Sequence, residues 1–320
     1  MPIITGRNNH MSKKIAFIFP GQGSQYPGMG KEFVETFPLA KQIFEEADDR
    51  LKRKLSALIL QGPEAELTET KNSQVAIYVT SYAILRCVQH EFPHLYPTYC
   101  AGLSLGEYTA ATAAGKISFA DGLTLVQSRG QFMNDACEKT AGTMAVVLGL
   151  DADTVEDLVN ALNLPHDLWV ANYNCPGQVV ISGTLKGIEE GSAAAKAKGA
   201  KRILPLQVHG AFHSGLMREA EERLAEHVQQ ASFTDSPVPL VMNVTGTSAN
   251  DLEEIRSNLI KQVTHSVRWQ QGIEHICKQG IDQFIEFGCG KTLAGFNKRI
   301  GVLAPTLSIE TLADLKHLAE

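Results

Sequence analysis

The stretch Cys100-Ala-Gly-Leu-Ser-Leu-Gly-Glu-Tyr108 places a serine between two glycines, directly after a short apolar run and before an alanine-rich segment that favours a helix. This pattern is typical of a nucleophile elbow, a sharp strand-to-helix turn that strains the serine backbone at the end of a sheet. We expect positions 102 and 106 to require glycine, because a Cβ at either position would clash with the neighbouring strand or helix. The hydroxyl of Ser104 would face solvent, and the amide of Leu105 would point toward an oxyanion formed beside it.

A serine between two glycines can also mark a turn with only a structural role, so its surroundings must decide. Residues 99–101 form the apolar approach that a buried strand needs, and helix-forming residues follow from Leu105 to Ala114, where Gly115 ends them. This context favours a catalytic Ser104 over a structural turn.

The composition is that of a globular protein, with 320 residues of which 44% are hydrophobic and 20% charged. No apolar run approaches the roughly 18 residues of a membrane span and no signal-peptide core occurs, so we expect a cytoplasmic protein without a membrane partner. The six cysteines show no paired short spacing, so we expect no metal site and reduced thiols. A net charge of −6 argues against general nucleic-acid binding.

The hydrophobic pattern predicts an α/β protein in two parts. We expect a discontinuous larger domain at 12–138 and 209–312, with a smaller domain at 139–208 and a leader or cloning remnant at 1–11. The larger part should contain strands at 14–19, 238–244 and 283–287 and helices at 38–55, 73–90, 105–114, 119–136, 218–230, 252–262, 267–279 and 293–300.

The smaller part has the order strand, helix, strand, strand, helix, strand, which is that of a ferredoxin-like unit. We expect Asp153 to open its first helix and Cys175-Pro-Gly177 to form the turn between its two middle strands. The expected strands are at 143–150, 168–174, 178–182 and 201–208, and the expected helices are at 154–162 and 185–198.

Two glycine-rich loops suggest nucleotide binding but fail the corresponding motifs. In Pro20-Gly-Gln-Gly-Ser-Gln25, the third glycine of a dinucleotide fingerprint is replaced by Tyr26. In the loop that ends with Gly290-Lys-Thr292, Ile285 stands where a P-loop needs its first glycine. We therefore expect the first loop to bring backbone amides and Gln22 close to a different ligand.

Six motifs together resemble one family, the malonyl-coenzyme A:acyl-carrier-protein transacylases of bacterial-type fatty-acid synthesis, which are related to the acyltransferase domains of polyketide synthases. They follow the family's order and spacing from about Lys13 to about Ile309. The motifs are Phe19-Pro-Gly-Gln-Gly-Ser-Gln25, Gly102-Leu-Ser-Leu-Gly-Glu-Tyr108, Ser128-Arg-Gly130, Asn172-Tyr-Asn-Cys-Pro-Gly-Gln-Val-Val-Ile-Ser-Gly183, Ala211-Phe-His213 and Glu286-Phe-Gly288.

The resemblance implies an α/β-hydrolase-like catalytic domain with an inserted ferredoxin-like subdomain and an active site between them. It implies that Ser104 is the nucleophile and His213 its general base. It further implies that the amides of Gln22 and Leu105 form the oxyanion hole, and that the backbone carbonyl of Gln262 holds the histidine. A carbonyl in place of a carboxylate would make this a dyad, whose imidazolium is less stabilised than in a triad.

The same resemblance implies the substrates, malonyl-CoA and acyl carrier protein. Arg129 is expected to hold the free malonyl carboxylate through two charge-assisted hydrogen bonds, which an acetyl group cannot make. Phe212 is similar to the aromatic residue of malonyl-selective members, so we expect malonyl to be preferred over methylmalonyl. One departure is Leu103, where most members have histidine. That histidine is not the general base, so the chemistry should not depend on it.

No cofactor is implied beyond the coenzyme A thioester that serves as substrate, and we expect a monomer. Basic side chains are the candidates for docking an acidic carrier protein, and those near the site motifs are Lys116, Lys291, Lys298 and Arg299. Fatty-acid synthesis is the expected pathway, because no synthase module accompanies the domain. Two other functions remain open: a serine hydrolase that gives the acyl group to water, and a carrier-binding scaffold without activity.

Overall fold

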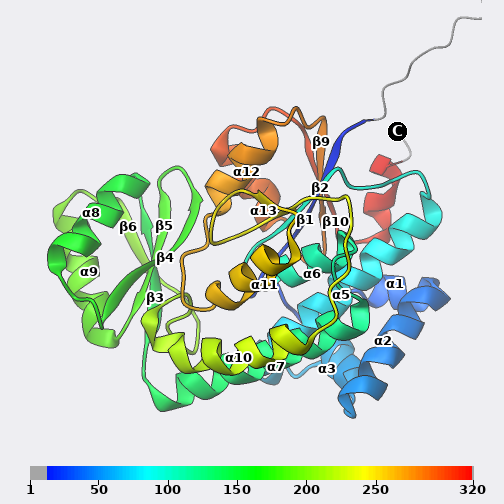
Figure 1. The fold of residues 1–320 in the computed structure, drawn as a ribbon, viewed down its shortest axis with the longest axis horizontal. Coiled ribbons are helices and arrows are strands. Elements are labelled where there is room, and N and C mark those ends of the chain that lie inside the picture. Colours follow the sequence, from blue (N-terminus) through cyan, green and yellow to red (C-terminus); the bar gives the residue numbers. More distant parts are fainter. Residues whose placement is uncertain (1–12, 319–320) are drawn as a thin grey trace, which may run out of the picture.

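The computed structural model describes residues 13–318, and its chain forms two sheets with helices packed against them (Figure 1). The leader expected at 1–11 lies outside the described residues. The protein is a mixed α/β fold, with the larger sheet at the right of the view and the smaller sheet at the left.

The larger sheet has the strand order β10-β9-β1-β2-β7-β8, and its strands are parallel except for the β7–β8 pair. Because β1 lies in the middle, all five of its residues are buried. The strands are β1 (Ile15–Phe19), β2 (Tyr99–Gly102), β7 (Leu240–Val241), β8 (Ser248–Ala249), β9 (Gln283–Phe287) and β10 (Thr306–Ile309).

Helices cover both faces of this sheet, and the side chains of β1 point alternately toward the helices of one face and the other. Ile15, Phe17 and Phe19 enter the main core with α5, α6, α7 and α10, whereas Ala16 and Ile18 pack with α12 and α13. The helices of this part are α1 (Lys31–Thr36), α2 (Pro38–Leu51), α3 (Leu55–Gln61), α4 (Glu64–Thr68), α5 (Thr70–Glu91), α6 (Gly106–Ala113), α7 (Phe119–Lys139), α10 (Arg218–Gln230), α11 (Leu252–Lys261), α12 (Trp269–Cys277) and α13 (Thr292–Ile300), with 3₁₀ turns at Gly215–Met217 and Leu312–Leu318.

The smaller sheet is antiparallel, with the order β4-β5-β3-β6 and with two helices, and its elements follow the chain as β3-α8-β4-β5-α9-β6. The turn after Cys175 is as predicted, with Gly177 at φ 71°. The prediction for the start of α8 was wrong, because the side chain of Asp151 caps this helix and Asp153 lies inside it. The elements are β3 (Thr143–Leu148), α8 (Ala152–Leu162), β4 (Leu168–Cys175), β5 (Gln178–Gly183), α9 (Leu185–Ala197) and β6 (Arg202–Pro205).

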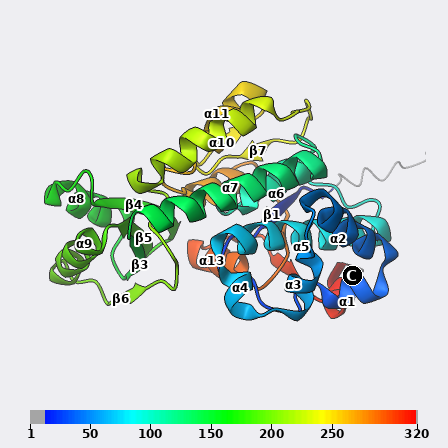
Figure 2. The same ribbon diagram turned by 90° about the horizontal axis from the view of Figure 1, so that it is seen from below.

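The two sheets are joined by α7 and by backbone hydrogen bonds. Figure 2 shows α7 running lengthwise from the region of α6 toward β4 and β5. Val267, which precedes α12, donates to the carbonyl of Ala171 at 2.8 Å and accepts from the amide of Tyr173 at 2.9 Å, so it extends the edge of β4. The larger part is therefore hydrogen-bonded to the smaller sheet through one isolated parallel bridge, between Val267 and Asn172.

Some elements of the larger part differ from the prediction. The helix expected at 38–55 ends at Leu51, because Lys52 adopts a left-handed conformation with φ 53°, and α3 starts a new direction at Leu55. The strand expected at 238–244 is only Leu240–Val241. The sequence did not indicate α1, α4 or β10, which are all six residues or shorter.

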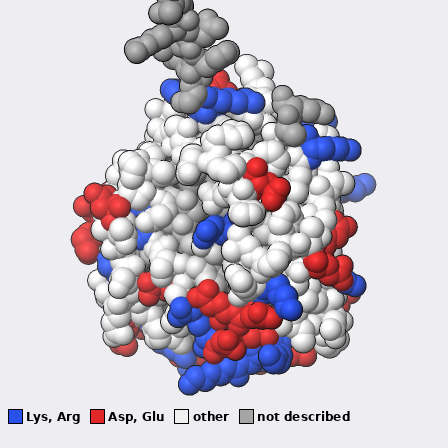
Figure 3. Space-filling view, turned by 90° about the vertical axis from the view of Figure 1, so that its right-hand side faces the viewer, with Lys and Arg blue, Asp and Glu red and all other residues white. Residues whose placement is uncertain are grey.

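Charged side chains on the side of the molecule that carries α1 and α2 are intermixed in sign, and their largest gathering lies at the lower edge of the view (Figure 3). On α2, Lys41 lies 3.9 Å from Glu45 and Arg50 lies 2.7 Å from Glu46. This side therefore offers no extended surface of one sign. Within residues 13–318, no helix is both long and apolar enough to cross a bilayer.

Candidate functional site

The serine of the elbow lies at the carboxyl end of β2 in a left-handed conformation, with φ 53°. The two glycines are needed as predicted. A Cβ on Gly102 would lie 1.9 Å from the carbonyl oxygen of Gly106, and a Cβ on Gly106 would lie 2.2 Å from that of Phe19. Asn243 fixes the turn from the next segment of the sheet. Its side chain accepts from the Ser104 amide at 2.7 Å and donates to the Gly102 carbonyl at 2.7 Å.

His213 reaches this serine from the segment that follows β6, also with a positive φ of 57°. Its Nε2 lies 2.8 Å from Ser104 Oγ, and its Nδ1 lies 2.7 Å from the backbone oxygen of Gln262. Because a carbonyl only accepts, Nδ1 carries the proton, and Nε2 is left to accept from the serine hydroxyl. Burial and the nearby Arg129 lower the pKa of His213 to about 4, so the ring is an unprotonated base at neutral pH.

Arg129 projects from α7 into the same site and is 1% exposed. Its guanidinium donates to Ser104 Oγ at 3.0 Å, to Gln262 Oε1 at 2.7 Å and to Gln74 Oε1 at 2.5 Å. Its Nε has no acceptor, and no carboxylate of residues 13–318 lies within ion-pair distance. Burial lowers the pKa of this side chain, yet a guanidinium stays charged in proteins. The site therefore contains a buried cation that an anionic group would stabilise.

Two loops meet beside the serine. A Cβ on Gly21 would lie 2.5 Å from the carbonyl oxygen of Leu103, so only glycine lets the loop after β1 approach the elbow this closely. The amide of Leu105 lies at the N-terminus of α6, where the helix dipole favours negative charge. Among the described residues, neither this amide nor that of Gln22 has a hydrogen-bond acceptor. Both are free to bind a developing oxyanion.

Three further residues complete the site, and the sequence reasoning missed them. Asn243 and Gln74 are described above. Glu107 is fully buried on α6, and its Oε2 accepts from Gln262 Nε2 at 2.7 Å. Glu107 lies inside the elbow motif, so the sequence could have indicated it as a site residue. Gln74 and Asn243 reach the site only through contacts between segments distant in sequence.

The other predicted residues are the two chain neighbours Phe212 and Leu103 and the basic docking candidates. Phe212 is 6% exposed and packs in the main core, and Leu103 packs in the core under α12 and α13. Lys116 was wrong as a docking candidate, because it is fully buried and its Nζ donates to the Ser236 carbonyl at 2.5 Å. Arg299 and Lys298 are exposed on α13.

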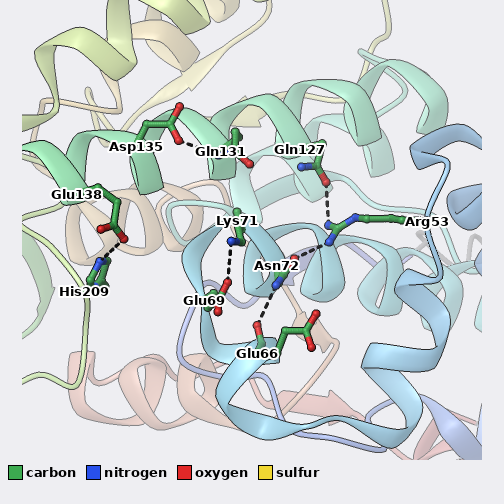
Figure 4. A network of polar contacts seen from close by, with 10 residues as sticks. All are labelled: Arg53, Glu66, Glu69, Lys71, Asn72, Gln127, Gln131, Asp135, Glu138 and His209. Atoms are coloured by element: carbon green, nitrogen blue, oxygen red, sulfur yellow. Dashed lines mark hydrogen bonds and ion pairs between the residues drawn. The ribbon is translucent and has the colours of Figure 1, made fainter.

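Two cavities are lined by residues of the site. One of about 490 Å³ is lined by His213, Trp169 and Arg268, and the other, of about 450 Å³, by Gln22 and Lys71. The mouth of the second cavity carries polar pairs. Figure 4 shows Lys71 beside Glu69, at 2.9 Å, and His209 beside Glu138, at 2.8 Å. Residues 13–318 contain no cluster of three or more His, Cys, Asp or Glu side chains that could hold a metal ion.

Several known proteins resemble this chain over most of its length. A family model described as acyl transferase domain matches residues 16–294. The malonyl CoA-acyl carrier protein transacylase of Bacillus subtilis (strain 168) is 44% identical over 297 residues, which cover 92% of this chain and 93% of that protein. Two solved structures superpose over nearly the whole chain.

The first of these structures is an acyl carrier protein S-malonyltransferase from Vibrio cholerae O1 biovar eltor str. N16961. It has a TM-score of 0.91 and 35% identity, and the match covers 96% of this chain and 100% of that chain. The second is a malonyl-transacylase in complex with a type II PKS acyl-carrier protein. It has a TM-score of 0.90 and 38% identity, and the match covers 95% and 98% of the two chains.

Proposed function

This chain belongs to the acyl transferase family, and from that premise we propose that it transfers the malonyl group of malonyl-CoA to the phosphopantetheine thiol of acyl carrier protein for fatty-acid synthesis. The observation that carries the proposal is the contact of one serine hydroxyl with both a neutral histidine and a buried arginine, at 2.8 Å and 3.0 Å. The first contact suits nucleophilic attack, and the second suits an acyl group that ends in a carboxylate.

The proposed reaction is a double displacement. His213 takes the proton of Ser104 as the oxygen attacks the thioester carbonyl, and the tetrahedral oxyanion is stabilised by the amides of Gln22 and Leu105, with each donor contributing about 3 kcal/mol. Coenzyme A then leaves as the thiol, with the proton from His213. The carrier thiol attacks the malonyl-serine in the reverse sequence and regenerates the free hydroxyl.

Arg129 gives this chemistry its substrate preference. A malonyl carboxylate would pair with the buried guanidinium, whereas an acetyl group would leave the guanidinium unpaired at a cost of about 2 to 5 kcal/mol. Phe212 is proposed to disfavour a methyl branch on the acyl group. The same proposal assigns the larger part to an α/β-hydrolase-like domain and the part with β3 to β6 to a ferredoxin-like subdomain.

The carrier protein is proposed to dock beside α13. Gly288, after β9, lies against Pro20, since its Cβ would be 2.9 Å from Pro20 Cγ, and Arg299 donates to Gln178 of β5 at 2.6 Å. The segment that leads into α13 therefore lies against the start of the loop of Gln22, and α13 itself contacts the smaller sheet. Lys298 and Arg299 offer exposed positive charge there.

Intact-protein mass spectrometry tests the proposal. Brief mixing with malonyl-CoA should give a single malonyl adduct on the wild type and none on Ser104→Ala. The adduct should pass to acyl carrier protein faster than to water, and acetyl-CoA should give little of it. Rapid release of free malonate with or without carrier would instead identify a hydrolase, and a protein without adduct or turnover would be an inactive scaffold.

A further inference from the structure

The buried glutamate beneath the serine has no part in the reaction described above. Glu107 is 0% exposed, and no cation of residues 13–318 pairs with it directly. Both of its carboxyl oxygens face N–H donors. Oε1 accepts from the backbone amide of Asn243 at 2.5 Å, and Oε2 accepts from Gln262 Nε2 at 2.7 Å. This carboxyl is therefore held at two points, and one of them is a side chain of the site.

Gln262 is the residue that connects the reactive groups. Its side-chain Nε2 donates to the carbonyl of Ser104 at 2.8 Å as well as to Glu107, and its Oε1 accepts from Arg129 at 2.7 Å. Its backbone oxygen holds His213. The amide of Gln262 thus lies directly between the guanidinium of Arg129 and the buried carboxyl of Glu107.

An amide group can be placed in either of two orientations, and its neighbours decide between them. A carboxylate only accepts and a guanidinium only donates. In the observed orientation all three contacts of the Gln262 amide, with Arg129, Glu107 and the Ser104 carbonyl, are complementary. In the reversed orientation, its NH₂ group would face the donors of Arg129, and its oxygen would face the oxygen of Glu107.

We propose that Glu107 is a positioning residue that fixes the amide of Gln262 and, through it, aims Arg129 at the carboxylate of the acyl group. The inference rests on the proposed malonyl transfer and deepens it, because it names the residue that sets the selectivity of that transfer. Loading of acetyl groups does not use the arginine clamp and should depend on Glu107 far less.

The role of Glu107 should depend on pH, because its carboxyl can be protonated. Burial raises the pKa of Glu107 to about 8, against the opposing effect of its two N–H donors and Arg129. A protonated carboxyl has an O–H to donate and stops opposing the reversed amide, so the observed orientation then depends on Arg129 and the Ser104 carbonyl alone. The other ionisable groups around it do not titrate near this pH. Arg129 remains charged, burial raises the pKa of Tyr108, and the pKa of His213 is about 4.

The test compares Glu107→Gln with the wild type by the ratio of kcat/KM for malonyl-CoA to that for acetyl-CoA. At pH 9 we expect the ratio to fall about tenfold in the variant, in line with the loss of one charge-assisted hydrogen bond. From pH 6 to 9 the wild-type ratio should rise with a midpoint near 8, whereas the ratio of the variant should stay flat. Equal loss of both activities, or the same pH profile in both proteins, would overturn the proposal.

Gln262→Met removes the side-chain amide and provides a second variant for the same test. We expect it to lower the ratio as Glu107→Gln does, and the double variant should fall no further, because both changes break the same link. Independent, multiplicative losses would contradict the proposal. If Glu107→Gln cannot be purified, an unchanged ratio in Gln262→Met alone would still overturn it.

Glu286→Gln is the matched control. Glu286 is also fully buried, and both its oxygens accept from backbone amides, those of Leu293 and Ala294, each at 3.0 Å. These contacts hold α13 and do not reach Gln262, so this variant should lose thermal stability and keep the malonyl-to-acetyl ratio. A wild type that forms no malonyl adduct would refute the proposed function. If the malonyl adduct forms but Glu107→Gln leaves the malonyl-to-acetyl ratio unchanged, only the present inference is refuted.

Discussion

At the scale of single residues, Arg129 carries the selectivity that we propose. We expect Arg129→Lys to slow malonyl loading about 10- to 100-fold, because an ammonium group cannot reproduce the two-pronged contact with a carboxylate. Acetyl loading should change by less than about threefold, since it makes no such contact. Rapid-quench mass spectrometry of the acyl-enzyme measures both rates.

Arg53 offers a matched control for that variant. It is a half-buried arginine that donates to Asn72 at 2.5 Å and to Gln127 at 2.9 Å, in the polar network of Figure 4. Arg53→Lys should leave the loading of both acyl groups unchanged. Equal slowing of malonyl and acetyl loading in Arg129→Lys would show that the arginine supports the fold of the site and does not bind the carboxylate.

The second prediction at this scale concerns His213 and pH. Because burial and Arg129 lower its pKa from 6.5 to about 4, the ring remains an acceptor in moderately acidic solution. We expect the single-turnover rate of malonyl loading to stay level from pH 7 down to about 5 and to fall only near 4. An acid limb centred near pH 6.5 would contradict this.

The same shift has a consequence for stability. Between pH 6.5 and about 4, the unfolded chain binds a proton at this histidine that the folded chain excludes. The contribution of His213 to the free energy of unfolding therefore falls as the pH is lowered through this range.

At the scale of elements, the elbow depends on how closely α6 approaches β1. We expect Gly106→Ala to destabilise the protein by about 3 kcal/mol or more, because its Cβ would lie 2.2 Å from the backbone oxygen of Phe19 and neither segment can yield cheaply. Gly295→Ala is the control, since nothing lies within 4 Å of its added Cβ on α13. That variant should be neutral or more stable by up to about 1 kcal/mol. Thermal and urea denaturation measure both changes, and equal effects of the two substitutions would refute the argument.

Elements whose pattern is local could be predicted from the sequence. The apolar run of β1, the glycines of the elbow and the turn after Cys175 each follow from the chemistry of a few neighbouring positions. The short strand β10 and the break at Lys52 could not be predicted, because packing of other segments decides them. Asn243 contacts the amide of Ser104 across 139 residues of sequence, so only the folded chain reveals that it belongs to the site.

At the scale of the whole molecule, the site lies where the two sheets meet, and α13 borders both. We expect Lys298→Glu to raise the KM for acyl carrier protein about 3- to 10-fold, because it places repulsion where an acidic carrier is proposed to dock. The effect should shrink in high salt. Loading from malonyl-CoA at saturation should remain, and steady-state kinetics at two salt concentrations measure the difference.

Lys186 on α9 is the control for this charge reversal. It is an exposed lysine that lies 3.7 Å from Glu190, on the outer side of the smaller sheet. Lys186→Glu should leave the KM for the carrier unchanged. If both reversals weakened the carrier equally, net charge alone would account for the effect and α13 would not be the docking surface.

The positive φ of Ser104 also limits which nucleophiles this scaffold could exchange. At φ 53° a residue with an unbranched Cβ is tolerated, whereas a second heavy atom on Cβ adds strain against the backbone. This backbone would therefore accept a cysteine nucleophile at position 104. A threonine nucleophile would first require a different turn between β2 and α6.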